Sequence, residues 1–177
     1  MSETSQDRGI DAQGLTRLAD AAQSDPSTGH KVVRARSVWE SGFRNQNYVR
    51  SHAPVLVSEP HQLLGDDEAP NPTEMALSAL GSCINVGLLA NATHRGVTLT
   101  TIEVELEGDI DISAVWGVGD LAPDKALGIT DVRVNVTLAG DADEQTLQQI
   151  TDQAIAWSPV VNTFTRPVGL TASLTVA

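Results

Sequence analysis

Cysteine is almost absent from this sequence, because Cys83 is the only one among 177 residues. A single cysteine excludes an intrachain disulfide framework. The four histidines are scattered and have no cysteine beside them, so no spacing typical of a metal site is present. We interpret them as surface histidines and expect neither a metal nor another cofactor. The chain therefore offers one thiol and little other recognisable chemistry.

Basic side chains are also scarce. Eleven Lys and Arg stand against 23 Asp and Glu, which gives a formal net charge of −12. Proteins that bind nucleic acids or anionic membranes need a basic surface, so we expect this protein to bind neither. Residues 1–8 are polar, predict disorder and contain no apolar stretch of the signal-peptide type. We therefore expect a cytoplasmic protein, long enough to bury the core of one domain.

An uninterrupted hydrophobic run of membrane-spanning length is missing too. The most apolar segment, residues 72–95, is instead predicted to form a long helix of about 36 Å. Asn71 and Glu74 have capping-box spacing, Pro72 suits the first helical position, and Gly96 suits the end. Apolar or small residues occupy nearly every side of this helix, so we expect it to be buried nearly all round. The polar residues that interrupt the apolar run, and so argue against a membrane span, are Ser78, Ser82, Asn85, Asn91 and Thr93.

The residues before this helix predict one short helix and a small sheet. Apolar residues recur at helical spacing over residues 10–22, which predicts an amphipathic helix. Strands are expected over residues 31–39, 43–50 and 53–58, as an antiparallel meander with Pro54 at the start of an edge strand. Residues 59–70 then form an acidic loop that leads into the long helix.

The residues after the long helix alternate between strands and helices. Period-two patterns predict strands over residues 98–108 and 129–138, joined by a long excursion. A second helix follows, with Asp141 and Glu144 at cap and capping-box positions. Its predicted buried stripe consists of Leu147, Ile150, Ala154 and Trp157. A break at Ser158-Pro159, a short turn over residues 160–165 and a closing strand over residues 169–176 complete an α+β chain.

This order of elements, together with three blocks of sequence, resembles the OsmC and organic hydroperoxide resistance family. The resemblance extends from about residue 32 to residue 175, most of the chain. The blocks are Pro70-Asn71-Pro72-Thr73-Glu74 with Ala79-Leu80-Gly81-Ser82-Cys83, Arg95-Gly96-Val97 with the strand that follows it, and Ser158-Pro159-Val160-Val161-Asn162-Thr163.

The resemblance implies an α+β OsmC-like fold, with antiparallel sheets and a long buried central helix, assembled as an intertwined two-fold homodimer. It divides the chain into an N-terminal extension with a short helix, residues 1–30, and a single OsmC-like domain, residues 31–177. Family enzymes reduce organic hydroperoxides with one cysteine that attacks the peroxide and a second that resolves the sulfenic acid. Cys83 matches the first, whereas Ser158 stands in place of the second. An external thiol would therefore have to resolve Cys83.

A peroxidatic cysteine must be a thiolate, which a nearby cation favours. The resemblance implies an arginine in this role, and Arg44 is the best match, with Arg36 and Arg50 as competitors. It also implies that Glu74 orients that arginine, although the capping box alone explains Glu74. Glu74 lies nine residues before Cys83, about 180° around and about 13 Å along a straight helix. An arginine between them, a deviation at the helix start, or a site shared with the partner protomer would each reconcile the two positions.

Two roles are open for Ser158, a hydrogen bond to the thiol or a cap of the local backbone. Three functions are open for the chain. The first is a one-cysteine thiol-dependent peroxidase acting on organic hydroperoxides. The second is a non-catalytic module that binds a small apolar ligand at the dimer interface, and the third is a purely structural dimer. In the last two functions, Cys83 is an inert core cysteine rather than a nucleophile.

Overall fold

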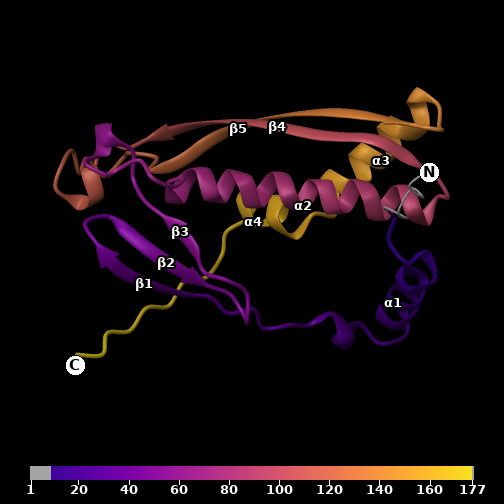
Figure 1. Ribbon diagram of the computed structural model, residues 1–177, viewed down its shortest axis with the longest axis horizontal. Helices are drawn as coiled ribbons and strands as arrows, with labels where there is room; N and C mark the ends of the chain where they lie inside the picture. The colour runs from indigo at the N-terminus through magenta and orange to yellow at the C-terminus, as the bar shows by residue number, and fades with distance from the viewer. Residues whose placement is uncertain (1–8, 177) are drawn as a thin grey trace, which may run out of the picture. The chain divides into compact units, whose positions relative to one another are not determined.

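The computed structural model describes residues 9–176, so the disorder predicted for residues 1–8 lies outside the described residues. These residues form a mixed fold with four α-helices and two antiparallel sheets (Figure 1). The chain divides into two units, which we describe separately. One contains residues 11–79 and 105–135, and the other contains residues 80–104 and 136–177 with the N-terminal ten. The predicted boundary between an extension of residues 1–30 and a domain of residues 31–177 stays a prediction.

The first unit begins with the predicted amphipathic helix and the predicted meander. Helix α1 spans Ala12–Ser24, and none of its residues is buried. The three-stranded sheet has the order β1-β2-β3, with β1 at Arg36–Ser41, β2 at Arg44–Tyr48 and β3 at Val55–Val57. Both pairings are antiparallel, and β3 lies at an edge as Pro54 predicted. Strand β1 starts five residues later than expected, because residues 31–35 pair with no strand in the described chain.

The long helix α2, Pro72–His94, contributes residues to both units and confirms the predicted capping. The Asn71 backbone N–H donates to Glu74 Oε2, and the Glu74 N–H donates to Asn71 Oδ1, each at 2.8 Å. Beyond the helix, Gly96 has φ +70°, a conformation that glycine adopts without strain. By length and composition alone α2 is apolar enough to cross a bilayer, a test that core helices of water-soluble proteins also pass.

Burial of α2 differs from the prediction. The helix was expected to be buried nearly all round, but within the single chain it is buried on one side only. That side comprises Leu80, Gly81, Ile84, Leu88 and Ala92. Ser78, Ala79 and Ser82 are exposed, and Val86 is 70% exposed. The sequence pattern indicates which residues of α2 are apolar, but it does not show which of them have a packing partner. A single chain provides partners for one side of the helix only.

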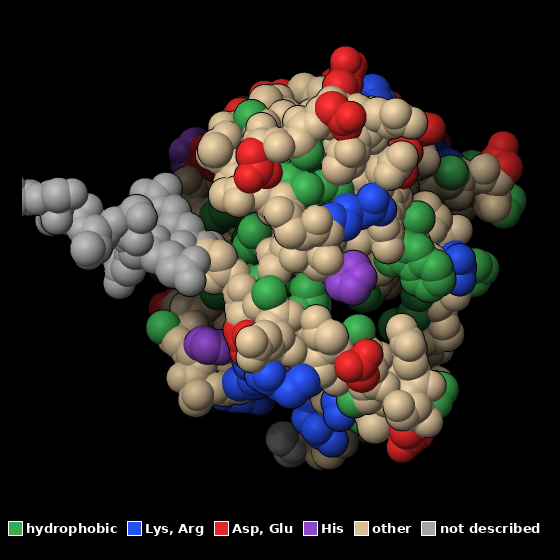
Figure 2. Space-filling view, turned by 90° about the vertical axis from the view of Figure 1, so that its right-hand side faces the viewer, with side chains coloured by type: hydrophobic (Ala, Val, Ile, Leu, Met, Phe, Trp, Pro, Cys, Tyr) green, Lys and Arg blue, Asp and Glu red, His purple; other side chains and the backbone are tan. Residues whose placement is uncertain are grey.

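Few hydrophobic side chains are buried in the described part of the chain. They are Val57, Leu80, Ile84, Leu88, Ala92, Ala114, Ile150 and Ala154. Many large hydrophobic residues are exposed instead, and hydrophobic side chains appear at the surface in Figure 2. A soluble monomer usually buries a larger share of such residues.

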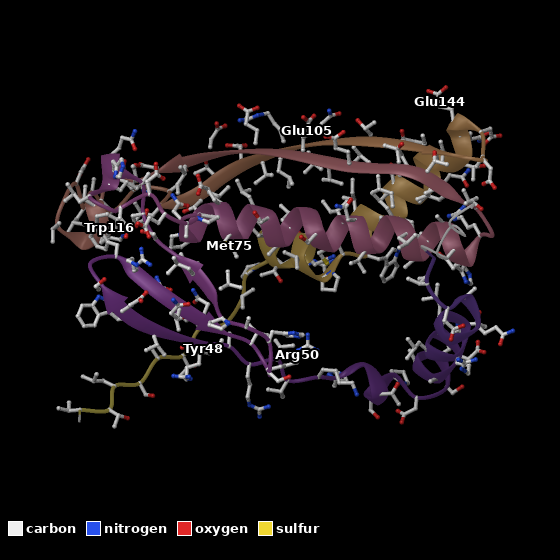
Figure 3. All side chains as sticks on the ribbon, viewed as in Figure 1. Tyr48, Arg50, Met75, Glu105, Trp116 and Glu144 are labelled. Atoms are coloured by element: carbon white, nitrogen blue, oxygen red, sulfur yellow. The ribbon has the colours of Figure 1, made fainter. Side chains whose placement is uncertain are left out.

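Strands β4, Leu99–Asp111, and β5, Gly128–Gly140, form the two-stranded sheet. At the connection between them, both are longer than predicted, because β4 ends at residue 111 instead of 108 and β5 begins at residue 128 instead of 129. In the first unit, Gly108 of β4 faces Leu77 of α2, whereas Glu105 points away from this helix (Figure 3). Within the β4 to β5 connection, Trp116 has φ 52° and stacks on Phe43, with ring centroids 5.1 Å apart. This stacking ties the connection to the turn between β1 and β2.

Helix α3, Glu144–Ala156, begins two residues later than predicted. Asp143 is the actual N-cap, because its side chain accepts from the Thr146 N–H at 2.8 Å. Asp141, the predicted cap, accepts instead from the Thr98 N–H. Ile150 and Ala154 are buried as predicted, but Trp157 is 80% exposed.

Two predictions for the C-terminal part are wrong. Residues 160–165 are not a turn but lie in helix α4, Pro159–Thr165. Within the described residues 169–176, the predicted closing strand is absent. Its alternating apolar residues project into solvent, with Leu170 92% and Leu174 87% exposed. The segment has a strand-like sequence, but no strand among residues 9–176 pairs with it.

Candidate functional site

The only thiol of the chain contacts a buried hydroxyl. Cys83 lies in the middle of α2 and is half-buried. The Ser158 hydroxyl donates to Cys83 Sγ, with Oγ and Sγ 3.1 Å apart. Ser158 is only 2% exposed, and both residues belong to the unit that contains residues 80–104 and 136–177. The structure therefore brings two of the predicted site residues, Cys83 and Ser158, into direct contact.

Local backbone geometry fixes Ser158 in place. Ser158 precedes Pro159, and its φ of −68° and ψ of 121° are the extended values that a following proline favours. It is the N-cap of α4, where its Oγ accepts from the Val161 N–H at 3.2 Å. Its carbonyl accepts from the Asn162 backbone and side-chain N–H groups at 3.0 and 2.9 Å. The two predicted roles of Ser158, backbone cap and thiol partner, are thus held by one hydroxyl.

Close packing of α2 against α3 sets this contact. A Cβ atom at Gly87 would lie 3.2 Å from the Ala154 Cβ, so a side chain at Gly87 would push the two helices apart. Cys83 is one helical turn before Gly87, and Ser158 is one turn beyond Ala154. Arg95 fastens the end of α2 to α3, with bonds to the Gln149 and Gln153 side-chain oxygens of 3.1 and 2.7 Å.

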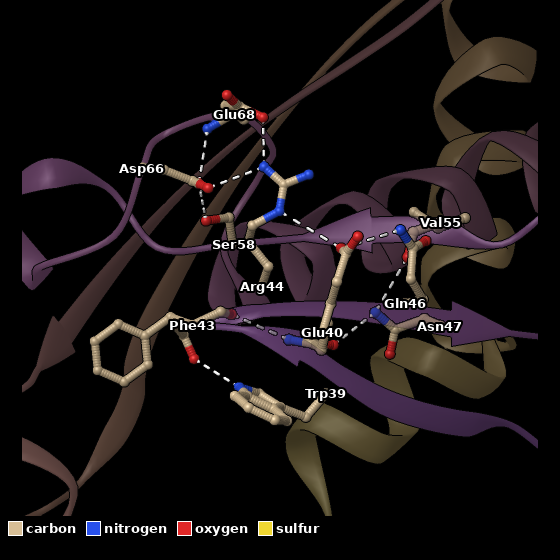
Figure 4. A network of polar contacts seen from close by, with 12 residues as sticks. Trp39, Glu40, Phe43, Arg44, Gln46, Asn47, Val55, Ser58, Asp66 and Glu68 are labelled. Atoms are coloured by element: carbon tan, nitrogen blue, oxygen red, sulfur yellow. Dashed lines mark hydrogen bonds and ion pairs between the residues drawn. The ribbon is translucent and has the colours of Figure 1, made fainter.

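Arg44, the candidate cation, lies in the other unit in a network of carboxylates (Figure 4). Its guanidinium donates to Asp66 Oδ2 at 2.9 Å, to Glu68 Oε2, and more weakly to Glu40 Oε2 at 3.5 Å. These bonds raise the pKa of Arg44 above its already high ordinary value. Within its own unit, the charge of Arg44 is therefore matched by acidic side chains.

Asp66 organises the acidic loop around Arg44. The Ser58 hydroxyl donates to Asp66 Oδ1, and Ser58 itself is almost completely buried. The Ser58 and Arg44 hydrogen bonds lower the pKa of Asp66 to about 2. Sequence reasoning recognised residues 59–70 as an acidic loop beside the long helix, but it did not identify Asp66 and Glu68 as partners of Arg44.

Glu74 serves as the capping residue of α2, where the Asn71 N–H binds its carboxylate. A second acid, Glu59, was missed by the sequence analysis. Glu59 is 9% exposed, and its Oε2 has no hydrogen-bond partner within residues 9–176. Burial, and to a lesser extent the charge of Glu74, raises the pKa of Glu59. No residue pattern announces a buried carboxyl, because its burial depends on how the loop folds over it.

The competing arginines occupy different settings in the unit of residues 11–79. The Arg36 guanidinium lies over the Tyr48 ring, 4.4 Å from its centroid. Arg50 follows β2 with φ 52° (Figure 3). Arg44, Arg36, Arg50 and Glu74 thus belong to one unit, whereas Cys83 and Ser158 belong to the other. Among residues 9–176, no group of three or more His, Cys, Asp and Glu side chains is arranged to hold a metal ion.

Comparison with known proteins identifies the fold. No curated protein matches the chain. Three solved structures have a similar fold. An OsmC-like protein of Mycoplasma pneumoniae has a TM-score of 0.63 and 13% sequence identity to this chain, and an OsmC-like protein of unknown function of Vibrio cholerae has a TM-score of 0.60 and 17% identity. The organic hydroperoxide resistance protein OsmC of Legionella pneumophila has a TM-score of 0.57 and 15% identity. Each alignment covers 76% of this chain, and it covers 88%, 94% and 89% of those chains, respectively.

At these identities the structural neighbours establish the fold alone. The sequence itself adds a family assignment, because the family model described as OsmC-like protein matches residues 65–173. That range contains the whole of α2 with Cys83 and extends past Ser158. It covers more than half of the 177 residues. The resemblance seen in the sequence is confirmed, and the chain belongs to the OsmC family.

Proposed function

We propose that this OsmC-family protein is a one-cysteine, thiol-dependent peroxidase that reduces organic hydroperoxides at Cys83. The observation that carries the proposal is the hydrogen bond from the buried Ser158 hydroxyl to Cys83 Sγ, inside a family that includes proteins named for organic hydroperoxide resistance. An inert core cysteine needs no such partner. A sulfur held beside a fixed donor is suited to carry negative charge.

The proposed reaction has two stages. First, the Cys83 thiolate attacks the terminal, hydrogen-bearing oxygen of the hydroperoxide. A sulfur–oxygen bond forms, the oxygen–oxygen bond breaks, and the alkoxide leaves as an alcohol after taking up a proton. Sulfur is thereby oxidised to a sulfenic acid, and the hydroperoxide is reduced.

Resolution must then come from outside the chain, since Cys83 is the only cysteine. An external thiol attacks the sulfenic sulfur, releases water and forms a mixed disulfide. A second thiol group, from the same dithiol or another molecule, displaces the Cys83 thiolate and leaves as a disulfide. A cytoplasmic location, which we also propose, supplies such reductants.

The active form in this proposal is an intertwined two-fold homodimer. The exposed face of α2, where Val86 is 70% exposed, supports a second copy of the helix packing there. The exposed, alternating residues 168–176 support the pairing of this segment with a sheet of the partner. In such a dimer we retain Arg44 as the cation for Cys83 and Glu74 as its orienting carboxylate, both on the strength of the family resemblance.

Substitution of the thiol tests the proposal. With a dithiol reductant in excess, the wild type should consume an organic hydroperoxide catalytically, whereas Cys83→Ser should consume it no faster than buffer with dithiol. The measurement is peroxide remaining against time, with the oligomeric state and melting temperature of both proteins checked alongside. A wild type that consumes no hydroperoxide under any thiol would refute the peroxidase proposal.

A second candidate function is a module that binds a small apolar ligand at the dimer interface. The observation that favours it is the lone cysteine, which leaves the chain unable to complete a turnover by itself. In this case an apolar ligand would raise the melting temperature equally in the wild type and in Cys83→Ser. The same pair of proteins therefore distinguishes the two functions.

A further inference from the structure

We infer that Ser158 is the positioning residue that favours the thiolate form of Cys83, so that the residue standing in place of a resolving cysteine activates the sulfur instead. This inference rests on the proposed function. It concerns how the reactive thiolate is stabilised, and its test does not require turnover.

Counting the hydrogens of this contact gives its direction. A serine hydroxyl has one hydrogen to donate and two lone pairs that accept. The Val161 N–H already occupies a lone pair of Ser158 Oγ at 3.2 Å. The hydroxyl hydrogen is left for Cys83 Sγ, 3.1 Å away. When Cys83 ionises, its sulfur can only accept, and a hydrogen bond to a charged acceptor is stronger than one to a neutral acceptor. The contact therefore favours the thiolate over the thiol.

Rigidity of Ser158 adds to this effect. The side chain is 2% exposed, so water competes little for its hydroxyl. Its backbone is held by the proline that follows and by the two Asn162 bonds to its carbonyl. The donor is therefore already oriented when the charge forms, and no reorganisation is needed.

Charged side chains do not supply the same help within this unit. Helix α2 has no charged residue between Glu74 and His94, and α4 has none at all. The charged residues of α3, Glu144 and Asp152, are exposed, and α3 meets α2 through Ala154. The remaining charged residues that the structure describes in this unit are exposed as well, namely His94, Arg95, Glu103, Asp141, Asp143 and Arg166. Arg95 is engaged by Gln149 and Gln153. The Ser158 hydroxyl is thus the donor that the unit itself brings to Cys83.

The test follows the alkylation rate of reduced Cys83 by iodoacetamide as a function of pH, because only the thiolate reacts. Ser158→Ala should slow alkylation at neutral pH about tenfold and move the pH profile to higher pH. Ser158→Thr, which keeps the hydroxyl and the cap, should restore the wild-type profile. Asp143→Ala removes the equivalent N-cap of α3 without touching sulfur, and it should leave the profile unchanged.

Loss of the α4 cap is a separate effect of Ser158→Ala, so Ser158→Gly serves as a second variant. Glycine at an N-cap costs only a few tenths of a kcal/mol relative to serine, and it also lacks the hydroxyl. Both variants should show the same slowed alkylation. A wild-type rate and profile in either folded variant would overturn the inference, and so would equal slowing in Asp143→Ala. A displaced profile in a protein that consumes no hydroperoxide would uphold the inference and refute the peroxidase proposal.

Discussion

Replacing Ser158 with cysteine should convert the protein into one that closes an intramolecular disulfide when it meets an organic hydroperoxide. The Ser158 Oγ and Cys83 Sγ atoms are 3.1 Å apart. A disulfide needs a sulfur–sulfur distance of about 2.0 Å, and the longer carbon–sulfur bond at position 158 covers part of this difference. Once Cys83 is a sulfenic acid, the introduced thiol attacks its sulfur and water leaves.

The expected effect is the loss of both free thiols for each hydroperoxide consumed, with the product reversed by a dithiol. Thiol titration and intact mass under non-reducing conditions measure it directly. Thr163→Cys is the matched control, because Thr163 lies on the same helix, is exposed, and donates its hydroxyl only to the Pro159 carbonyl. That variant also has two cysteines but should form no intramolecular disulfide. If Ser158→Cys keeps a free second thiol after Cys83 is oxidised, the contact between α2 and the start of α4 is not populated in solution.

The second large effect is expected on assembly. Ala79, Ser82 and Val86 lie on one exposed face of α2, and Val86 is 70% exposed in the single chain. If this face packs against a second copy, Val86→Glu places an unpaired charge in the interface. Burying such a charge costs about 3 to 5 kcal/mol, which weakens dimerisation at least about 100-fold.

Light scattering coupled to size-exclusion chromatography measures this change over a range of protein concentrations. The wild type should elute with the mass of two chains, and Val86→Glu with the mass of one at low concentration. Val33→Glu is the control, because Val33 is 91% exposed and lies in the stretch before β1. Its mass should match the wild type. A wild type that remains a single chain at high concentration would disprove the dimer and leave the exposed face of α2 without an explanation.

The parts of the fold that local chemistry decides were predictable. The α2 capping box depends on Asn71 and Glu74, three residues apart, and both expected bonds are present. The period-two patterns of β4 and β5 depend only on neighbouring residues, and both strands formed. The meander β1-β2-β3 was predicted from its turns, although its strands are shorter than expected.

Two of the errors arose where a residue distant in the sequence decides the outcome. Asp141 and Asp143 are both suitable caps, and the Thr98 N–H, 43 residues away from Asp141, takes the first of them. The closing strand failed because a strand requires a partner edge, which an alternating pattern cannot supply. Helix α4 was missed because it is short and contains β-branched residues, while its Ser158 cap stabilises it.

The candidate site was predictable only in part. The sequence and the family resemblance selected Cys83 and Ser158, 75 positions apart, and the structure joins them. The sequence did not predict that Asp66 and Glu68 bind Arg44, or that Glu59 is buried, because both depend on the path of the acidic loop. The roles of Arg44 and Glu74 stay predictions.

The most direct test of the central claim is the rate at which Cys83 loses its thiol when reduced protein is mixed with an organic hydroperoxide in a stopped-flow instrument. Free cysteine at the same pH is the reference. An activated thiolate predicts a rate many orders of magnitude above that of free cysteine, followed by recovery of the thiol when an external dithiol is added. A rate equal to that of free cysteine would contradict the account, since the hydrogen-bonded sulfur would then be no more reactive than an ordinary thiol.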